Sequence, residues 1–183
     1  MQQRVVAIGN PCARLPNHQK KARDLTEAKI PTLSEWGGGL SSFRRLTKRF
    51  YEKIPADPVL APVFAGMDPH HAEHVAAFIS EVFGGPKDYT SDGGSHAAMI
   101  GRHLGRHLTH VQRKRWIEVM LETADEVGLP DDPEFRAAFV GYLEWGTRLA
   151  VLNSQDGVAA PVDDPPMPTW NWGPPGGPYT GPS

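Results

Sequence analysis

The 183-residue sequence contains one cysteine, Cys12, so it has no pair of thiols for an internal disulfide. A single thiol also excludes a four-cysteine zinc site and fits a reducing compartment. No apolar run reaches the roughly 20 residues that a transmembrane helix needs, and the N-terminus lacks the apolar core of a signal peptide. The net charge of −2 provides no basic excess for binding nucleic acid. We therefore expect a soluble, cytoplasmic protein that binds neither membrane nor nucleic acid.

Patterns typical of β-strands are missing as well, because no window alternates apolar and polar residues for long enough. Apolar residues recur at helical spacing instead, and a polar loop is predicted over residues 87–94. Capping residues mark three helix starts, at Asp68-Pro69, Thr109 with Gln112, and Asp132-Pro133. The predicted fold class is all-α, with helices over residues 40–54, 68–82, 95–104, 109–127 and 133–150.

Proline and glycine gather at the two ends of the chain and divide it into three parts. Residues 1–31 show no sustained period and are predicted to be a flexible N-terminal extension. Residues 32–154 form the predicted helical domain. Residues 155–183 are a Pro/Gly-rich tail that cannot be helical, yet the tail carries Trp170, Trp172 and Tyr179. Two states of this tail stay open: a disordered segment, or an extended strap whose aromatic rings dock on the domain or on a partner.

Two histidines in the helical part are predicted to face inward. His71 precedes Phe78 by seven residues and so lies on the apolar stripe of its helix, while His103 follows Met99 by four residues on a shared face. A buried neutral imidazole without a hydrogen-bond partner costs about 1–3 kcal/mol. Each ring therefore needs a partner, which is either a backbone carbonyl or a functional group such as a metal.

A zinc site is one reading of these histidines, because His103 and His107 are spaced four residues apart, as zinc ligands often are. A metalloprotease pattern would place a general-base glutamate directly after the first histidine, where this chain has Leu104. Gly105 also lies between the pair, and no third ligand is evident. The spacing is therefore a weak signal for zinc.

Several separated motifs, taken together and in order, are typical of one protein family. They are Phe50-Tyr51, Asp57-Pro58-Val59-Leu60 with Phe64, Phe83-Gly84-Gly85-Pro86 with Tyr89, His96, Arg102-His103, Trp116 with Met120, and Asn153. None is specific alone, but their order and spacing over residues 37–154 resemble the group II truncated haemoglobins. The resemblance implies a 2-on-2 helical sandwich around a haem, with the N- and C-terminal segments as extensions outside it.

The resemblance also implies roles for single residues. His103 is the expected proximal ligand of the iron, and Tyr51 and Trp116 are the expected hydrogen-bond donors to the bound gas. His71 takes the distal position of its helix, as a third donor or as a gate. The remaining cofactor-binding positions that it implies are Phe64, His74, Val75, Phe78, Lys87, Tyr89, Met99 and Arg102, of which Arg102, Lys87, Tyr89 and His74 are expected near the haem propionates.

Two positions depart from the family pattern. Leu104-Gly105-Arg106 follows the expected proximal histidine, where many relatives have a Pro-Phe step, and Phe64 stands where some members have a tyrosine. The first departure bears on the orientation of the histidine ring. The second removes one hydroxyl from the expected distal hydrogen-bond network.

The implied function is that of a haem b protein that reversibly binds oxygen, nitric oxide, carbon monoxide or peroxide. Oxygen transport and redox chemistry, such as nitric oxide dioxygenation or peroxide turnover, are both open, and the latter needs an electron donor. Whether the protein is an enzyme or a homodimer is open too. Two alternatives from other classes stay beside this reading: a non-haem metal protein that uses His103 and His107, and a scaffold whose Trp-rich tail recruits a partner.

Overall fold

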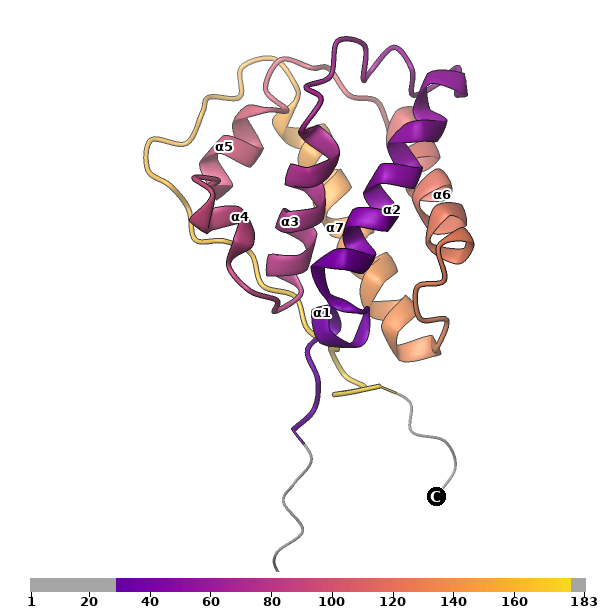
Figure 1. The fold of residues 1–183 in the computed structure, drawn as a ribbon. Helices are drawn as coiled ribbons and strands as arrows, with labels where there is room; N and C mark the ends of the chain where they lie inside the picture. Colours follow the sequence, from indigo (N-terminus) through magenta and orange to yellow (C-terminus); the bar gives the residue numbers. More distant parts are fainter. Residues whose placement is uncertain (1–28, 179–183) are drawn as a thin grey trace, which may run out of the picture.

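The computed structural model describes residues 29–178, and every regular element in that range is helical (Figure 1). The predicted all-α fold class is therefore confirmed. Among these residues no helix is both long and apolar enough to cross a bilayer. The elements are α1 (Leu33–Trp36), α2 (Gly39–Lys53), the 3-10 helix η1 (Ile54–Ala56), α3 (His71–Val82), α4 (Asp88–Ser91), α5 (His96–Gly101), α6 (His110–Glu126) and α7 (Pro133–Asn153).

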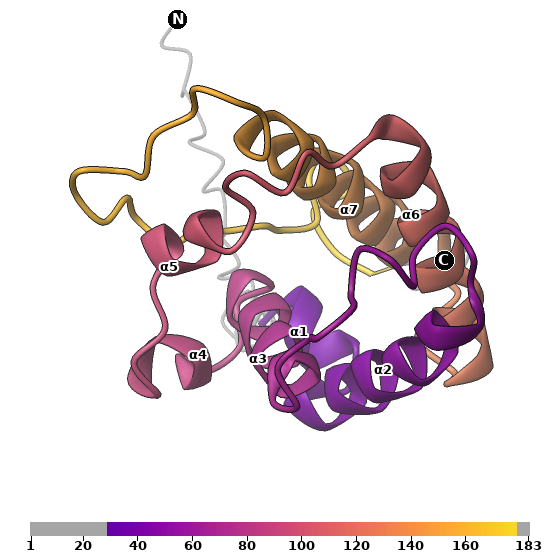
Figure 2. The ribbon, with the colours of Figure 1, turned by 90° about the horizontal axis from the view of Figure 1, so that it is seen from above.

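The long helices form two packed pairs, α2 with α3 and α6 with α7, and α2 also contacts α6. Figure 2 shows the two pairs side by side, with the short helices α4 and α5 at the edge of the molecule beyond α3. Helix α5 has no buried residue, in contrast to the four long helices. The pairs therefore carry the core, and α5 lies outside it.

Aromatic side chains fill the core between the pairs. Phe83, at the end of α3, is fully buried and contacts Phe43 of α2 at a ring-centroid distance of 5.7 Å. The same ring lies 6.1 Å from Phe139 and 5.1 Å from Tyr142, both on α7. These edge-to-face contacts suit the charge distribution of aromatic rings and add about 0.5–1.5 kcal/mol each beyond the area that they bury. One ring thus joins the two helix pairs.

A close approach of backbones explains the glycines after α3. A Cβ atom on Gly85 would lie 2.7 Å from the Ser34 and Ser80 hydroxyl oxygens, closer than atoms can pack. Those two buried hydroxyls are hydrogen-bonded to each other at 2.9 Å, and the Ser34 amide donates to the Phe83 carbonyl at 3.0 Å. Gly84 has a φ of +82°, a region that favours glycine. The Gly-Gly step thus lets α1 dock on the end of α3.

The predicted caps explain two of the helix starts. Thr109 and Gln112 form the predicted capping box of α6, and Asp132 accepts from the Phe135 amide at the start of α7 at 2.9 Å. The predicted start at Asp68-Pro69 is wrong by two residues, because α3 begins at His71. Asp68 instead accepts from the His70 amide at 2.7 Å and so stabilises the turn that precedes the helix.

The predicted loop over residues 87–94 contains a helical turn, α4, and α1 was not predicted at all. Both are stabilised by hydrogen bonds that the spacing of apolar residues does not show. In α4, the Thr90 amide and hydroxyl donate to the two carboxylate oxygens of Glu81 at 3.0 and 2.9 Å. In α1, Thr32 and Glu35 form a capping box around a helix of only four residues. Elements this short have too few residues to show a period.

The C-terminal strap, defined here as residues 158–178, runs extended along the domain. The Trp170 amide donates to the Val82 carbonyl at 2.8 Å, and its indole N–H donates to the Ala138 carbonyl at 2.9 Å. The Trp172 indole N–H donates to the Pro31 carbonyl at 2.7 Å, and this side chain is buried. Of the two states left open for the tail, the described part has the docked strap. The rest of the termini, with Cys12 and Tyr179, lies outside the described residues.

The segment between η1 and α3 is fixed by a buried carboxylate. Asp57 accepts from the Val59 and Leu60 amides at 3.0 Å each and from the Arg115 guanidinium on α6 at 2.6 Å. Burial raises the pKa of Asp57, but these three donors outweigh it and hold the pKa below its usual value. The carboxylate therefore stays ionised and ties this segment to α6.

We predict that Asp57→Ala lowers the free energy of unfolding by about 2 kcal/mol, because two backbone donors and the guanidinium lose their acceptor. Urea unfolding followed by circular dichroism measures the change. The exposed Asp131→Ala is the matched control and should stay within about 0.5 kcal/mol of wild type. Equal stabilities for the two variants would contradict the role given to Asp57.

Candidate functional site

Tyr51 of α2 and His71 of α3 form a hydrogen-bonded pair between the two helices. The Tyr51 hydroxyl lies 3.0 Å from His71 Nε2, and the two rings meet edge to face with centroids 5.0 Å apart. Tyr51 is buried and His71 is half-buried. The predicted inward stripe of α3 thus does carry His71 to a polar partner, and that partner is the tyrosine that the sequence analysis singled out.

Burial keeps both members of this pair uncharged. It raises the pKa of the Tyr51 hydroxyl above its ordinary value. It also lowers the pKa of His71 to about 4, and the positive charge of Arg102 acts in the same direction. At neutral pH the pair is therefore a protonated hydroxyl and a neutral imidazole.

Aromatic rings surround the Tyr51–His71 pair. Phe64 packs on Tyr51 with ring centroids 5.5 Å apart and lies 6.1 Å from His71. Phe50 contacts Tyr51 at 4.9 Å and, on its other side, Trp116 of α6 at 5.2 Å. Trp116 is half-buried, and within residues 29–178 its indole N–H donates to no acceptor. Tyr51, His71, Phe64 and Trp116 thus belong to one cluster.

His103 was predicted to lie inside a helix over residues 95–104. It lies instead in the turn that follows α5, one residue beyond the C-cap Arg102. Its Nδ1 is 3.0 Å from the Met99 carbonyl oxygen, which cannot donate, so Nδ1 carries the proton. Burial lowers the pKa of His103, partly opposed by this hydrogen bond and supported by the charge of Arg106. The ring is therefore neutral, and its Nε2 has a free lone pair, as a metal ligand needs.

Charged and polar groups gather around the same space. Arg102 is exposed, yet its charge acts on the pKa values of His71 and of Asp68. His74 has a buried Nδ1 atom with no partner in the described chain. Arg102 and His74 are thus two of the expected propionate contacts that lie near the His71 ring. Lys87 is exposed, and no described contact brings it to the cluster.

Tyr89 does not present its hydroxyl to this space. The ring is buried against Phe78 at a centroid distance of 5.1 Å, and the hydroxyl donates to the Ser95 carbonyl at 3.2 Å. Its pKa is raised by burial. Phe78 is buried beside it, while Val75 and Met99 are half-buried and pack on the edge of the core. In this structure Tyr89 therefore supports the α4–α5 segment.

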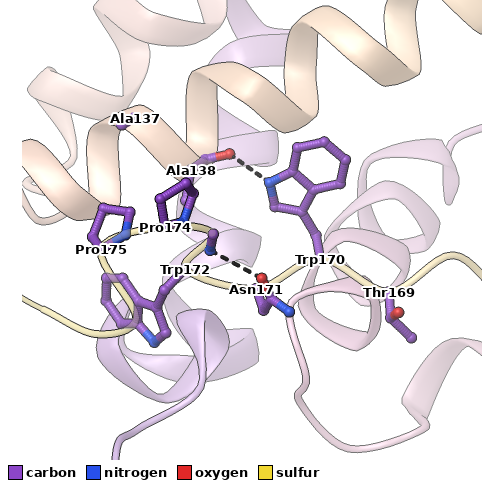
Figure 3. Close-up of a pocket in the computed structure, with 9 residues that line it drawn as sticks. Ala137, Ala138, Thr169, Trp170, Asn171, Trp172, Pro174 and Pro175 are labelled. Carbon is purple, nitrogen blue, oxygen red and sulfur yellow. Dashed lines mark hydrogen bonds between the residues drawn. The ribbon is translucent and has the colours of Figure 1, made fainter.

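A pocket of about 270 Å³ borders the cluster of Tyr51, His71, Phe64 and Trp116 and was not predicted from the sequence. Tyr51 and Phe64 are among the residues that line it. The other lining residues are small or apolar: Ile54, Pro55, Ala61, Ala65 and Met67. A Pro- and Ala-rich turn carries no period, so only the motif residues Tyr51 and Phe64 pointed toward this place. A second pocket, of about 370 Å³, lies between the strap and α7 (Figure 3).

The geometry offers little support for a non-haem metal site at His103 and His107 or for a tail that recruits a partner. His107 Nε2 lies 3.7 Å from Asp156, whereas the His103 ring is bonded to Met99. In residues 29–178 no group of three His, Cys, Asp or Glu side chains is placed to hold a metal. Trp170 and Trp172 of the tail donate to carbonyls of their own chain, so these indole N–H groups are not presented to a partner.

Comparison with known proteins decides the family. Residues 32–144 match the family described as bacterial-like globin. The chain belongs to that family. A group 2 truncated haemoglobin of Bacillus subtilis is 32% identical over 111 residues, which is 61% of this chain and 82% of the relative. This chain thus covers most of the relative's length, and residues 1–31 and 145–183 lie outside the family match.

Solved structures agree with this assignment. The haemoglobin of Chloroflexus aurantiacus is 32% identical, with a TM-score of 0.58 over 66% of this chain and 97% of the other. The truncated oxygen-avid haemoglobin of Bacillus subtilis is 29% identical, with a TM-score of 0.58 over 66% and 99%. The protein is a truncated haemoglobin of group II type with the 2-on-2 fold, and the family implies a haem cofactor.

We predict that the free energy of unfolding of the haem-free protein falls as the pH drops from about 6.5 toward 4, partly because of His71. The folded pKa of about 4 lies below the ordinary value of 6.5, so the unfolded chain binds more protons in this window. The contribution of His71 to the free energy of unfolding is thus fully present above pH 6.5 and is lost as the pH falls toward 4.

Urea unfolding of wild type and His71→Gln at half-unit pH steps tests this prediction. The Gln variant keeps a hydrogen-bonding group for Tyr51 but cannot titrate, so its stability should depend less steeply on pH by up to one proton. The two proteins having the same slope between pH 4.5 and 6.5 would contradict a buried, neutral His71.

Proposed function

We propose that His103 holds the iron of haem b through Nε2 and that Tyr51, His71 and Trp116 face the diatomic ligand. Its family identifies the protein as a haem globin that binds oxygen and related ligands. Haem supplies an iron with an open coordination position for a diatomic molecule when one protein imidazole occupies the opposite side. The observation that carries the assignment of His103 is its Nδ1–Met99 hydrogen bond, which leaves Nε2 unprotonated.

The surroundings of His103 fit a large apolar cofactor. Helix α5 buries none of its own residues, and Met99 and Leu104 beside the histidine are only half-buried. Arg102 is exposed and cationic, which suits a carboxylate of the cofactor. His74 has a buried ring nitrogen that needs a partner. We assign Arg102 and His74 to the propionates, and we assign Phe64, Val75 and Phe78 to the apolar lining.

Tyr51 and Trp116 are the donors in this proposal. The Tyr51 hydroxyl stays protonated because burial raises its pKa, and the neutral His71 ring fixes its orientation. The Trp116 indole N–H has no acceptor among the described residues and can donate only. Hydrogen bonds to a charged acceptor contribute about 1.5–3 kcal/mol each. Two such donors retain a ligand that carries partial negative charge far longer than an apolar pocket would.

Strong retention favours redox chemistry over delivery. One solved relative, from Bacillus subtilis, is described as oxygen-avid. We propose the same property here, and with it a role in nitric oxide dioxygenation or peroxide turnover. A one-electron donor would supply the electrons for either reaction. A cytoplasmic location is consistent with the single cysteine. No described contact bears on a homodimer.

For the iron ligand we predict that His103→Ala abolishes stable haem binding. The variant lacks the imidazole, and nothing else in the described chain offers a ring nitrogen in its place beside Met99. His107→Ala is the matched control, since it removes the exposed histidine four residues on. Haem titration followed by the Soret band and by pyridine haemochrome should show full binding for the control only. Normal haem content in His103→Ala would overturn the assignment.

For the distal donors we predict that Trp116→Phe and Tyr51→Phe each speed oxygen release by about 10- to 100-fold, because each removes one hydrogen bond of about 1.5–3 kcal/mol. Stopped-flow displacement of oxygen by carbon monoxide measures the rate. Leu152→Ala, which truncates an exposed side chain on α7, is the control and should release oxygen at the wild-type rate. Unchanged rates in both donor variants would remove Tyr51 and Trp116 from the ligand site.

A further inference from the structure

The C-terminal strap is anchored to the core by Trp170. Trp170 donates from its amide to Val82 at the end of α3 and from its indole to Ala138 on α7. Its ring also packs on Tyr142 at 5.9 Å and on Trp145 at 5.7 Å. Figure 3 shows this indole pointing at the α7 backbone. The strap therefore has a fixed position relative to both helix pairs.

Upstream of this anchor the strap passes α5 (Figures 1 and 2). The Asp164 carboxylate accepts from the Ala97 amide at 2.7 Å. Two residues later, the Pro166 carbonyl lies 2.8 Å from His96 Nδ1, which donates to it because a carbonyl cannot. The first turn of α5 is thus bound by a side chain and by the backbone of the strap.

Helix α5 has few other ties to the molecule. It buries no residue, and its own N-cap, Ser95, belongs to the same short segment. Among residues 29–178, the hydrogen bonds that α5 residues form outside the 95–104 segment are those to Asp164 and Pro166. Without the strap, the position of α5 would depend on its short connections and on partly buried side chains.

The position of α5 determines the position of the His103 ring. The Met99 carbonyl belongs to α5 and accepts from His103 Nδ1, and the His103 amide donates to Ile100 of the same helix at 2.9 Å. A shift or fraying of α5 therefore turns the imidazole. A metal ligand is oriented by the group that bonds its second nitrogen, so this turn would change the bond that Nε2 makes.

We propose that the strap is a positioning device for the proximal histidine, in which Asp164 and Pro166 hold α5 against the core that Trp170 anchors. Asp164 is a positioning residue, since it acts through α5 and Met99. The proposal rests on the proposed function of His103. Family membership does not supply this device, because the matched residues end at 144, ahead of the strap.

The test uses the haem-loaded full-length chain with three substitutions in the strap. Asp164→Ala removes the acceptor for the Ala97 amide, whereas Asp164→Asn keeps an oxygen in its place and should restore the contact. Asp163→Ala removes the neighbouring exposed carboxylate, which forms no hydrogen bond with another residue of the described range. These three proteins separate the acceptor function of residue 164 from charge and from general effects on the strap.

Three readouts follow the contact from the strap to the iron. Amide hydrogen exchange at Ala97 should become about tenfold faster in Asp164→Ala, as expected for the loss of about 1.4 kcal/mol of local stability. The iron–histidine stretching band in resonance Raman spectra should shift or broaden. Haem transfer to an acceptor apo-globin should become about threefold to tenfold faster. Asp164→Asn and Asp163→Ala should match wild type in all three.

The outcomes distinguish this inference from the proposed function. Faster exchange with an unchanged iron–histidine band and unchanged haem transfer would overturn the positioning role, as would unchanged exchange in Asp164→Ala. If Asp164→Ala does not fold, His96→Gln, which alters the second contact, is measured in the same way. Failure of the proposed function would appear in a different experiment, as normal haem binding by His103→Ala. In that case hydrogen exchange at Ala97 in the haem-free protein would still report the strap contact.

Discussion

The contacts of Phe83 with rings from α2 and α7 hold the two helix pairs together, and the other parts of the molecule depend on this junction. Phe83 is fully buried where α3 ends, so it fixes α3 against both α2 and α7. The Tyr51–His71 pair spans α2 and α3 and needs that spacing. The strap depends on it too, because Trp170 packs on Tyr142, which is itself a neighbour of Phe83.

The site combines buried polar groups that would be costly without partners. Tyr51 and His71 partner each other, and His103 finds the Met99 carbonyl, so each ring keeps a defined protonation state. Two groups of this region, the half-buried Trp116 indole N–H and the buried His74 Nδ1, have no partner among residues 29–178. The protein thus satisfies the groups that must be oriented and leaves available those that we assign to ligand and cofactor.

Much of the fold could be predicted from the sequence, because long helices have a period and their ends have caps. Thr109 and Asp132 show this clearly. The misses have physical causes. Asp68 was expected to cap α3 directly, but it stabilises the turn before the helix, and α4 depends on Glu81, a residue outside its own segment. Hydrogen bonds between distant segments leave no trace in a local pattern.

The site could be predicted only as a set of residue types. Spacing placed His71 on an inward face, and the family motifs pointed to Tyr51 as well, but no pattern indicated that the two would bond to each other. Tyr89 shows the opposite case, since its motif position suggested a cofactor contact while its hydroxyl is bonded to Ser95. Side-chain partners depend on how whole helices pack, and a local sequence pattern does not contain that information.

The docking of Trp172 on Pro31 also brings the two ends of the described chain together. A Cβ atom on Gly177 would lie 3.2 Å from the Ile30 side chain, so residues near 30 and 177 are neighbours in space. The described chain is therefore almost a closed ring. Such a ring suits circular permutation: a short linker can join these ends, and new termini can be opened in an exposed segment such as residues 155–160, without unravelling either helix pair.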